Sequence, residues 1–369
     1  MIQANKNITF ALKVTPYSTM TVYINARFMT QNCTGVQRVA GELSMRLPAL
    51  LNHNIVFLCP KGQLKNVLPN IVLRQFGYLK GHLWEQIEMP LFLFRQKAPY
   101  ILLNFCNSAP FLIQNKITTV HDMSVFQKEK WFKLHFKLFY RLLFSCLIRG
   151  NSTIVTVSNF SRDEILRVFP SFKRENINVV YHGNIRKNEE NAVAQNRESF
   201  FLAVSSMDPR KNIETILKAF NNPKHKIKLI GGGGNAFRDI QYSNSENIEF
   251  LGFVSDDELK AYYKKARGLV NASLYEGFGL PIAEAMSYGL PCIISDIPAY
   301  RELFSDAALF FSPKNPAELA EKLEELESNQ ALRAGLVQKG FEKAGGFSWD
   351  RAAQAYREII ENKLLKYAP

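Results

Sequence analysis

Two carboxylates, Glu276 and Glu284, lie in the segment EGFGLPIAEAMSYGLP (276–291), which follows a short apolar run. Its glycines permit a close approach of the backbone to a ligand, and its first proline suits the first turn of a helix. The start of that helix would bind a diphosphate, because its N–H groups and the helix dipole attract anions. Both carboxylates can accept hydrogen bonds from hydroxyls of the same ligand; the alternative is an ordinary helix with an acidic first turn. The N–H groups assigned to this anion site belong to Phe278, Gly279 and Leu280.

A basic pair, Arg210 and Lys211, lies in the segment SSMDPRKNIETILKAF (205–220). A guanidinium and an ammonium at the start of a helix can neutralise a diphosphate and stabilise it as a leaving group without a metal. Ser206, in the same turn, is assigned to the same donor site. A solvated basic turn is the alternative, and the glycine-containing segment in the same half of the chain favours the functional interpretation.

Two positions in the first half of the chain are candidates for the opposite side of the site. His121 closes the strand-like run TVHD (119–122), where an imidazole can hydrogen-bond a sugar hydroxyl or a phosphate, or move a proton. A structural histidine is the alternative. Gly35 opens the helical stretch TGVQRVAGEL (34–43), and we interpret it as letting that loop approach the ligand, although a plain turn glycine fits the pattern as well.

Short apolar runs alternate with helix-period segments along the chain, which is typical of βαβ units on a parallel sheet. We expect two doubly wound α/β domains facing across a cleft, with ligands beyond the carboxyl ends of the strands, where the motifs lie. The predicted strands are 21–28, 54–60, 100–105, 117–122, 152–158 and 176–183 in the first half, and 200–206, 226–232, 248–253, 268–273, 291–296 and 308–313 in the second.

The polar stretch NIRKNEENAVAQNRES without apolar periodicity indicates a linker between the domains. We expect residues 1–19 to be a loose extension, or Met20 to be the true start. The predicted units are an acceptor-binding domain over 1–183, the linker over 184–199, a donor-binding domain over 200–348, and a C-terminal helix over 349–369 that packs back toward the first domain.

The chain has 369 residues and a formal net charge of +13, which indicates an anionic partner. No zinc-finger spacing or aromatic RNA-binding strand supports nucleic acid, so phosphorylated substrates and an anionic membrane surface remain. The five cysteines are scattered and predict reduced thiols in a cytoplasmic protein. No apolar run is long enough to span a bilayer.

The segment 129–150 is basic, aromatic and amphipathic. It predicts either an interfacial helix on anionic lipid or a helix packed on the core with its lysines outside. The expected basic stripe is Lys130, Lys133, Lys137 and Arg141, and the expected apolar stripe is Phe132, Phe136, Phe139 and Leu143.

Three other functions compete with sugar transfer. A sugar-nucleotide epimerase could use the same two-domain fold, and a catalytically silent sugar-nucleotide-binding protein could keep the same site. An NAD-dependent oxidoreductase is disfavoured because no G-x-G-x-x-G fingerprint is present. The glycine run 231–234 lacks the acidic partner of that fingerprint, so we interpret it as a turn bordering a nucleotide.

Together, these motifs resemble glycosyltransferase family 4, the retaining enzymes of the GT-B fold, over nearly the whole chain from Met20. Within that family, the likeness is closest to bacterial mannosyl- and rhamnosyl-type transferases of surface polysaccharide assembly. The segments that carry it are TGVQRV, HLWEQIEMP (82–90), TVHD, IVTVSNFS (154–161), DPRKN, FLGFVSDDEL and EGFGLPIAEAMSYGLPCIISD. One departure is the loop before the first helix, where Gly35 stands without a second glycine.

The resemblance implies a role for each matched residue. Arg210 and Lys211 would hold the donor diphosphate, and Gly35 would border it. Glu276 would contact the donor sugar, Glu284 the ribose, and His121 the sugar from the first domain. The backbone around Phe253 and Val254 would meet the base.

The resemblance also implies the reaction. We expect transfer of a hexose, first of all mannose from GDP-mannose, to a hydroxyl of a lipid-linked saccharide with retention of configuration. No metal and no cofactor besides the donor is expected. The enzyme would be cytoplasmic and peripheral on the inner face of the plasma membrane.

Overall fold

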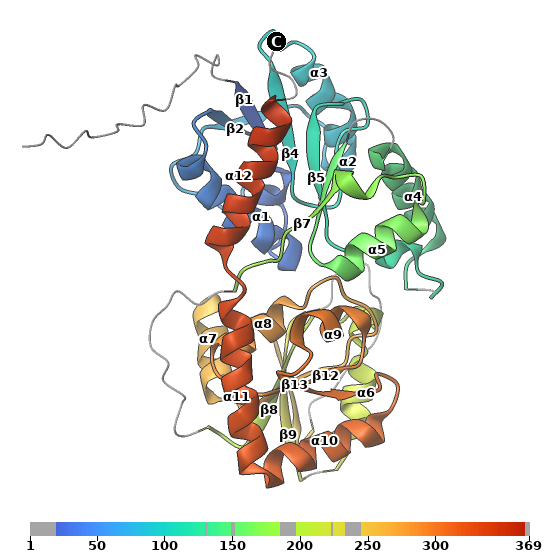
Figure 1. Cartoon of the computed structure of the whole chain (residues 1–369), viewed down its shortest axis with the longest axis vertical. Coiled ribbons are helices and arrows are strands. Elements are labelled where there is room, and N and C mark those ends of the chain that lie inside the picture. The colour runs from blue at the N-terminus through green and yellow to red at the C-terminus, as the bar shows by residue number, and fades with distance from the viewer. Residues whose placement is uncertain are drawn as a thin grey trace, which may run out of the picture.

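The computed structural model of the chain describes residues 20–129, 131–148, 152–184, 197–222, 224–232 and 245–365. These residues form two parallel β-sheets, each with helices on both faces, stacked along the long axis of the molecule (Figure 1). The prediction of two doubly wound α/β domains is therefore confirmed. The expected extension over 1–19, most of the predicted linker and the last two glycines of the run 231–234 lie outside the described residues.

The first sheet has seven strands in the order β3-β2-β1-β4-β5-β6-β7, and every neighbouring pair is parallel. The strand β3 has no counterpart among the predicted strands, because this edge strand is short and its two central residues are exposed and polar. The strands are β1 (Thr21–Asn25), β2 (Asn54–Pro60), β3 (Leu73–Phe76), β4 (Tyr100–Asn104), β5 (Lys116–Val120), β6 (Thr153–Thr156) and β7 (Ile177–Val179).

Helices cover both faces of the first sheet, as the alternation of side chains along β1 shows. Val22 and Ile24 belong to the core under α1, whereas Tyr23 packs with Trp84 and Met89 on the other face. The helices are α1 (Gly35–Leu50), α2 (Gly81–Leu83), the π-helical turn η2 (Trp84–Glu88), α3 (Met89–Leu93), α4 (Leu134–Ile148) and α5 (Asn159–Val168), with 3₁₀ turns at Arg27–Thr30, Ser124–Phe126 and Arg174–Asn176.

The second sheet has six strands in the order β10-β9-β8-β11-β12-β13, again all parallel. Its strands are β8 (Phe200–Val204), β9 (Lys226–Ile230), β10 (Ile248–Gly252), β11 (Gly268–Asn271), β12 (Cys292–Ser295) and β13 (Ala308–Phe311). Its helices are α6 (Ile213–Ala219), α7 (Asp256–Lys265), α8 (Leu280–Ser287), α9 (Pro298–Phe304), α10 (Pro316–Ser328) and α11 (Gln330–Gly345), and the 3₁₀ turn η5 (Pro209–Lys211) precedes α6.

The helix α12 (Trp349–Leu365) returns from the second domain to the first and lies along α1 (Figure 1). Trp349, Tyr356 and Ile360 are buried in the core that α1 shares with the first sheet. The Tyr356 hydroxyl also lies 2.7 Å from Thr119 Oγ1 on β5. The C-terminal helix is therefore a structural part of the first domain.

The predicted stripes of the segment 129–150 are wrong in part. Leu143, expected on the same stripe as Phe136, is fully buried with Leu147, whereas Phe136 is exposed. The helix is apolar on more than one side, so periodicity alone did not reveal which side faces the core. The large apolar side chains that it exposes are Leu134, Phe136, Leu138 and Leu142. Lys130 lies outside the described residues.

Replacing Tyr356 by alanine should lower the free energy of unfolding by about 3–5 kcal/mol, because a buried aromatic ring is lost and Thr119 loses its partner. Urea titration followed by circular dichroism measures the change. Glu358→Ala, on the exposed side of the same helix, is the control and should change the value by less than about 0.5 kcal/mol. Equal stabilities of the two variants would contradict the packing role of α12.

Candidate active site

The candidate site lies where the carboxyl ends of strands from both sheets meet. His121 and Asp122 follow β5 of the first sheet, while Arg210 follows β8 and Gly277 follows β11 of the second. Arg210 Nη1 lies 3.3 Å from Asp122 Oδ2, so an ion pair joins the two domains. A Cβ atom on Gly277 would overlap the backbone carbonyl oxygen of His121, which requires glycine at this contact.

The basic turn is held in place by hydrogen bonds on both sides of it. Asp208 Oδ1 accepts a hydrogen bond of 2.9 Å from the backbone N–H of Arg210 and caps the 3₁₀ turn η5. Asn212 adopts the left-handed conformation with φ of 53°, and its amide donates to the carbonyl oxygens of Ala272 at 3.1 Å and Pro313 at 2.5 Å. The turn is thereby fixed to the loops that follow β11 and β13.

Arg210 is charged and firmly positioned. Its Nε and Nη2 atoms lie 2.8 and 2.5 Å from Asp208 Oδ2, and its Cζ atom lies 5.3 Å from the centre of the Phe132 ring. Burial opposes its charge, but Asp122 and Asp208 outweigh that effect and raise the pKa of the guanidinium. Burial likewise opposes ionisation of Asp122, whereas Arg210 and Ser124 lower the pKa of this carboxyl.

Lys211 and Glu276 form an ion pair, and Ser273 Oγ donates a hydrogen bond of 2.9 Å to Glu276 Oε1. Lys211, predicted to hold the diphosphate, therefore contacts Glu276, predicted to bind the donor sugar. Both side chains are partly exposed at the cleft edge, so the pair can open toward a ligand.

The first turns of two helices face each other across the domains. Gly279, with φ of 106°, lets the chain enter α8 beneath the Tyr300 ring. A Cβ atom on Gly35, the first residue of α1, would lie 3.7 Å from Leu280 Cδ1 at the start of α8. The side chain of Phe278 is buried against His182, so only its backbone is available to an anion.

Glu284 is buried one turn into α8 between two partners that the sequence did not indicate. The Tyr263 hydroxyl donates to Glu284 Oε2 at 2.9 Å, and Arg38 Nη1 lies 3.4 Å from Oε1. Burial raises the pKa of Glu284 to about 7, although Arg38 and Tyr263 act in the opposite direction. Arg38 also pairs with Asp256, so α1 of the first domain reaches α7 and α8 of the second.

His121 is buried, and both of its ring nitrogens have partners. Nε2 lies 2.7 Å from the carbonyl oxygen of Phe105, which can only accept, so the proton is on Nε2. Nδ1 then accepts from His182 Nε2 at 3.3 Å. Burial lowers the pKa of both imidazoles, which makes the neutral pair the stable form. The predicted contact of His121 with a sugar hydroxyl requires the ring to exchange one of these partners, and it stays a prediction.

Phe253 and Val254, the residues assigned to the base, follow the carboxyl end of β10, and Ser206 of the predicted donor site follows that of β8. Phe253 is 75% exposed, and its ring covers Gly232, where a Cβ atom would overlap it. Val254 follows it and packs on the second core, and Ser206 is exposed beyond β8. The arrangement leaves an apolar ring beside the exposed end of the sheet, which suits stacking with a base.

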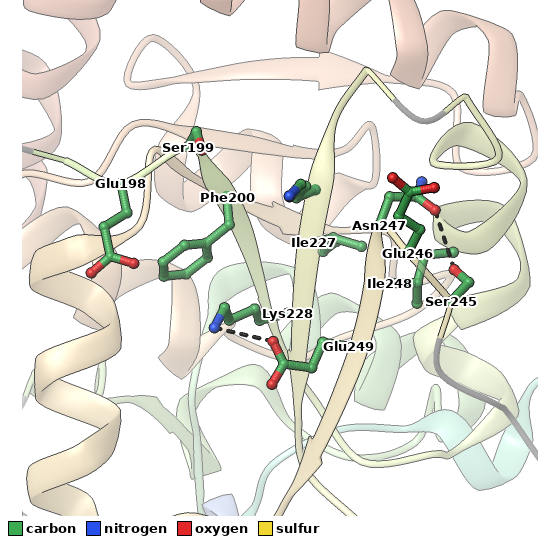
Figure 2. Close-up of a pocket in the computed structure, with 11 residues that line it drawn as sticks. Glu198, Ser199, Phe200, Ile227, Lys228, Ser245, Glu246, Asn247, Ile248 and Glu249 are labelled. Carbon is green, nitrogen blue, oxygen red and sulfur yellow. Dashed lines mark hydrogen bonds and ion pairs between the residues drawn. The ribbon is translucent and has the colours of Figure 1, made fainter.

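A cavity of about 320 Å³ lies at the other end of the second sheet (Figure 2). It is lined by the residues that begin β8, β9 and β10, and Lys228 pairs with Glu249 beside it at 3.1 Å. Ligands of parallel sheets bind at the carboxyl ends of the strands, so this cavity is not the candidate site. None of the predicted site residues lines it.

A second polar cluster, also without a predicted role, lies at the cleft edge of the first domain. Glu85 is fully buried, with Asn25 Nδ2 at 2.7 Å, Ser108 Oγ at 2.9 Å and His82 Nδ1 at 3.1 Å. Burial opposes its ionisation, but Arg27 at 3.5 Å and His82 lower the pKa of the carboxyl. Its segment HLWEQIEMP carried the resemblance but no single-residue assignment.

Solved structures share this architecture over more than nine-tenths of the chain. Sucrose-phosphate synthase from Thermosynechococcus elongatus superimposes with a TM-score of 0.68 at 17% identity, covering 93% of this chain and 100% of that one. WaaG, a glycosyltransferase involved in lipopolysaccharide biosynthesis, gives 0.68 at 13% identity over 92% and 99%. Anabaena HepE in complex with UDP and glucose gives 0.69 at 15% over 93% and 99%. The chain has the GT-B fold of glycosyltransferases.

Sequence comparisons find a family model and relatives that are similar to parts of the chain. The model described as Glycosyl transferases group 1 matches residues 184–343. The chain is 29% identical to O-antigen chain mannosyltransferase B of Escherichia coli over 279 residues, which cover 69% of this chain and 72% of the relative. It is 31% identical to O-antigen chain mannosyltransferase RfbU of Salmonella typhimurium over 209 residues, covering 55% and 58%. Residues 184–343, which hold most of the second domain, therefore match the group 1 glycosyltransferase family model, and the chain is similar in sequence to O-antigen mannosyltransferases.

Donor affinity should depend on pH through Glu284. Ribose hydroxyls donate to the ionised carboxylate, so affinity should rise by up to about tenfold from about pH 6 to pH 8, and Glu284→Gln should lose this rise. The same raised pKa means that this group stabilises the folded state at low pH and that its contribution is lost as pH rises toward about 7. Calorimetric titration with GDP-mannose tests the affinity. Glu358→Gln is the control, and a pH dependence retained in Glu284→Gln would refute the role.

Gly277→Ala should separate the two cleft edges, because the added methyl group would overlap the His121 carbonyl oxygen. The radius of gyration from small-angle scattering should increase in this variant. Gly345→Ala provides the matched control, since a Cβ atom there meets no neighbour. Identical radii for both variants and the unaltered protein would show that the contact does not set the domain spacing.

Proposed function

We propose that this protein is a glycosyltransferase that moves a hexose from a nucleoside diphosphate sugar to a hydroxyl of a lipid-linked saccharide, with retention of configuration, as in glycosyltransferase family 4. The observation that carries the proposal is the meeting of Arg210, Lys211 and Glu276 at the start of α8. Two cations and a helix N-terminus bind the diphosphate of a donor, and the carboxylate binds the hydroxyls of its sugar.

We propose mannose as the sugar and GDP-mannose as the donor. Two relatives that match more than half of the chain are named O-antigen chain mannosyltransferases, which supports both the sugar and an acceptor in surface polysaccharide assembly. A solved structure with the same fold is in complex with UDP and glucose, so the base has to be tested separately from the sugar. The exposed Phe253 ring accepts any base by stacking.

In the proposed reaction, the bond between the anomeric carbon and the diphosphate oxygen breaks while the acceptor oxygen attacks on the same face. The acceptor proton passes to the leaving diphosphate, so the reaction needs no separate carboxylate base. Arg210 and Lys211 stabilise the charge that develops on the leaving oxygen, which is the role of a metal in other enzymes. Among the described residues, no group of three or more His, Cys, Asp or Glu side chains is placed to hold a metal ion.

The competing functions differ in their products. A sugar-nucleotide epimerase would form an epimer from the donor alone, and a silent binding protein would form nothing. Incubating the enzyme with GDP-mannose, with and without octyl α-mannoside as acceptor, separates the three cases. Release of GDP together with a mannosylated octyl glycoside supports transfer.

Variants of the basic turn test the assignment of the diphosphate site. Arg210→Ala would leave the buried Asp208 without its partner and harm the fold, so Arg210→Lys, which keeps the charge, and Lys211→Met are the informative changes. Each should lower kcat/KM for mannosyl transfer by about a hundredfold or more. The negative charge that develops on the leaving diphosphate in the transition state would lose a positioned hydrogen-bond donor.

The control is Lys218→Ala, an exposed lysine of α6 that pairs with Glu214 on the same helix. It should leave kcat/KM unchanged. Thermal-shift titration with GDP-, UDP- and dTDP-sugars, run on every variant, shows whether donor binding is lost together with transfer. Full activity of Arg210→Lys and Lys211→Met would refute the proposed diphosphate site.

A further inference from the structure

The first domain presents the carboxyl ends of three neighbouring strands at the cleft edge. Arg27 follows β1, Asn107 follows β4 and Asp122 follows β5, and the three strands are adjacent in the order β1-β4-β5. Asp122 makes the ion pair with Arg210 of the second domain. Adjacent strands are about 5 Å apart, so Asn107 and Arg27 lie roughly one and two strand spacings beyond that ion pair.

Asn107 is held in an uncommon backbone conformation. Its φ is 56°, in the left-handed region, where residues other than glycine are rare and occur often at functional sites. Its backbone N–H donates to the carbonyl oxygen of Thr119 at 3.1 Å, and its Oδ1 accepts a hydrogen bond of 2.7 Å from the backbone N–H of His121. The residue thereby continues the hydrogen bonding between β4 and β5 beyond the end of β4.

This tether uses one end of the Asn107 amide and leaves the other end free. Because Oδ1 has to face the N–H of His121, the orientation of the amide is fixed and Nδ2 is directed elsewhere. Within the described residues, Nδ2 has no hydrogen-bond partner, and it is accessible to water or a ligand because the residue is only half-buried. The side chain is therefore a directed hydrogen-bond donor.

Arg27 offers further free donors at the next strand end but one. Its side chain is only 10% exposed, and Nη2 donates to Ser108 Oγ at 3.0 Å and lies 3.5 Å from Glu85 Oε2. Its Nε and Nη1 atoms have no hydrogen-bond partner in the part of the chain that the structure describes. Since a guanidinium is planar, holding Nη2 in place also fixes the directions of the free N–H groups.

The connection that carries Asn107 is fixed on both sides of it. The carbonyl oxygen of Phe105 accepts a hydrogen bond of 2.7 Å from His121 Nε2, and Ser108 Oγ donates to Glu85 at 2.9 Å. Side chains supported in this way keep their geometry before a ligand arrives. The free donors of Asn107 and Arg27 are thus presented on a rigid wall.

The charges at these strand ends are balanced, which indicates a neutral ligand. Arg27 lies beside Glu85, and Asp122 beside Arg210. The connection over residues 105–115 contains no charged residue. An anion would meet no unpaired cation among the residues described at these three strand ends, whereas hydroxyl groups can accept hydrogen bonds from the free N–H groups. A saccharide without charge is the ligand class that fits.

We infer that Asn107 and Arg27 bind hydroxyl groups of the acceptor saccharide and so determine which acceptor is used. The donor is the poorer ligand for this pair, because the groups proposed to bind it meet the first domain at β5, one and two strands away. That the saccharide is the acceptor rests on the proposed function, whereas the presence of a saccharide site does not. The inference leaves the lipid aside; within the described residues, no helix is long and apolar enough to cross a bilayer.

A purely structural role of Asn107, as a cap on the pairing of β4 with β5, is the alternative. Asn107→Asp separates the two roles, because aspartate tolerates the left-handed conformation and can still accept the N–H of His121. The variant replaces only the free N–H₂ group, by an oxygen that cannot donate. Arg27→Lys likewise keeps the charge beside Glu85 and loses the planar set of donors.

NMR titration of the full chain, with GDP present, against octyl α-mannoside and its 2-, 3-, 4- and 6-deoxy analogues tests the inference. The unaltered protein should bind at least one analogue about tenfold more weakly than the parent sugar, because a free N–H loses its acceptor. Asn107→Asp should bind the parent sugar about tenfold more weakly and no longer distinguish it from that analogue. Arg27→Lys should lose discrimination at a different hydroxyl.

Asn70→Asp is the matched control. Asn70 has the same left-handed conformation, with φ of 55°, but it is exposed in the loop before β3, at the opposite edge of the sheet. This variant should bind every sugar like the unaltered protein. Equal losses in Asn107→Asp and Asn70→Asp would overturn the inference, as would full discrimination retained in Asn107→Asp or none in the unaltered protein.

Release of GDP from GDP-mannose, measured with the same sugars, reports on the proposed function separately. Discrimination among the sugars without any transfer would refute the proposed reaction and leave the saccharide site in place. Transfer that is indifferent to every deoxy analogue would support the reaction and refute the roles of Asn107 and Arg27.

Discussion

The site depends on the close contact between the carboxyl ends of β5 and β11, where Gly277 meets the carbonyl oxygen of His121. Only a residue without a side chain allows this approach. The same contact brings Asp122 within 3.3 Å of Arg210, so the guanidinium lies between carboxylates of both domains. Arg210 is positioned before any ligand arrives, and an anion that enters meets a charge that needs little reorganisation.

Charged groups at the cleft occur in pairs. Lys211 with Glu276, and Arg38 with Glu284, each join a group suited to phosphate with one suited to hydroxyls. An unpaired charge at such depth would be costly, and the pairing offsets that cost while keeping both groups available. At Glu284 the pairing offsets only part of the cost of burial. Burial raises the pKa of this carboxyl to about 7, although Arg38 acts in the opposite direction.

The sequence predicted the fold and the segments of the site, because strand ends, glycine turns and helix starts are local features. Contacts between side chains that are distant in the sequence could not be predicted from it. Arg38 and Glu284 are 246 residues apart, and the ring partners of His121 come from two further loops. The strand β3 was missed because its exposed polar centre lacks an apolar pattern, and the exposed side of α4 was misassigned because that helix is apolar on several sides.

The return of α12 has a consequence for the order of events during synthesis. The core beneath α1 includes Trp349, Tyr356 and Leu364, which leave the ribosome after the entire second domain. The sheet of the first domain emerges much earlier. The apolar surface that α12 covers in the folded protein stays exposed until this helix has been synthesised. The second domain can therefore complete its core first, and the nascent first domain is the part of the chain that needs protection by chaperones.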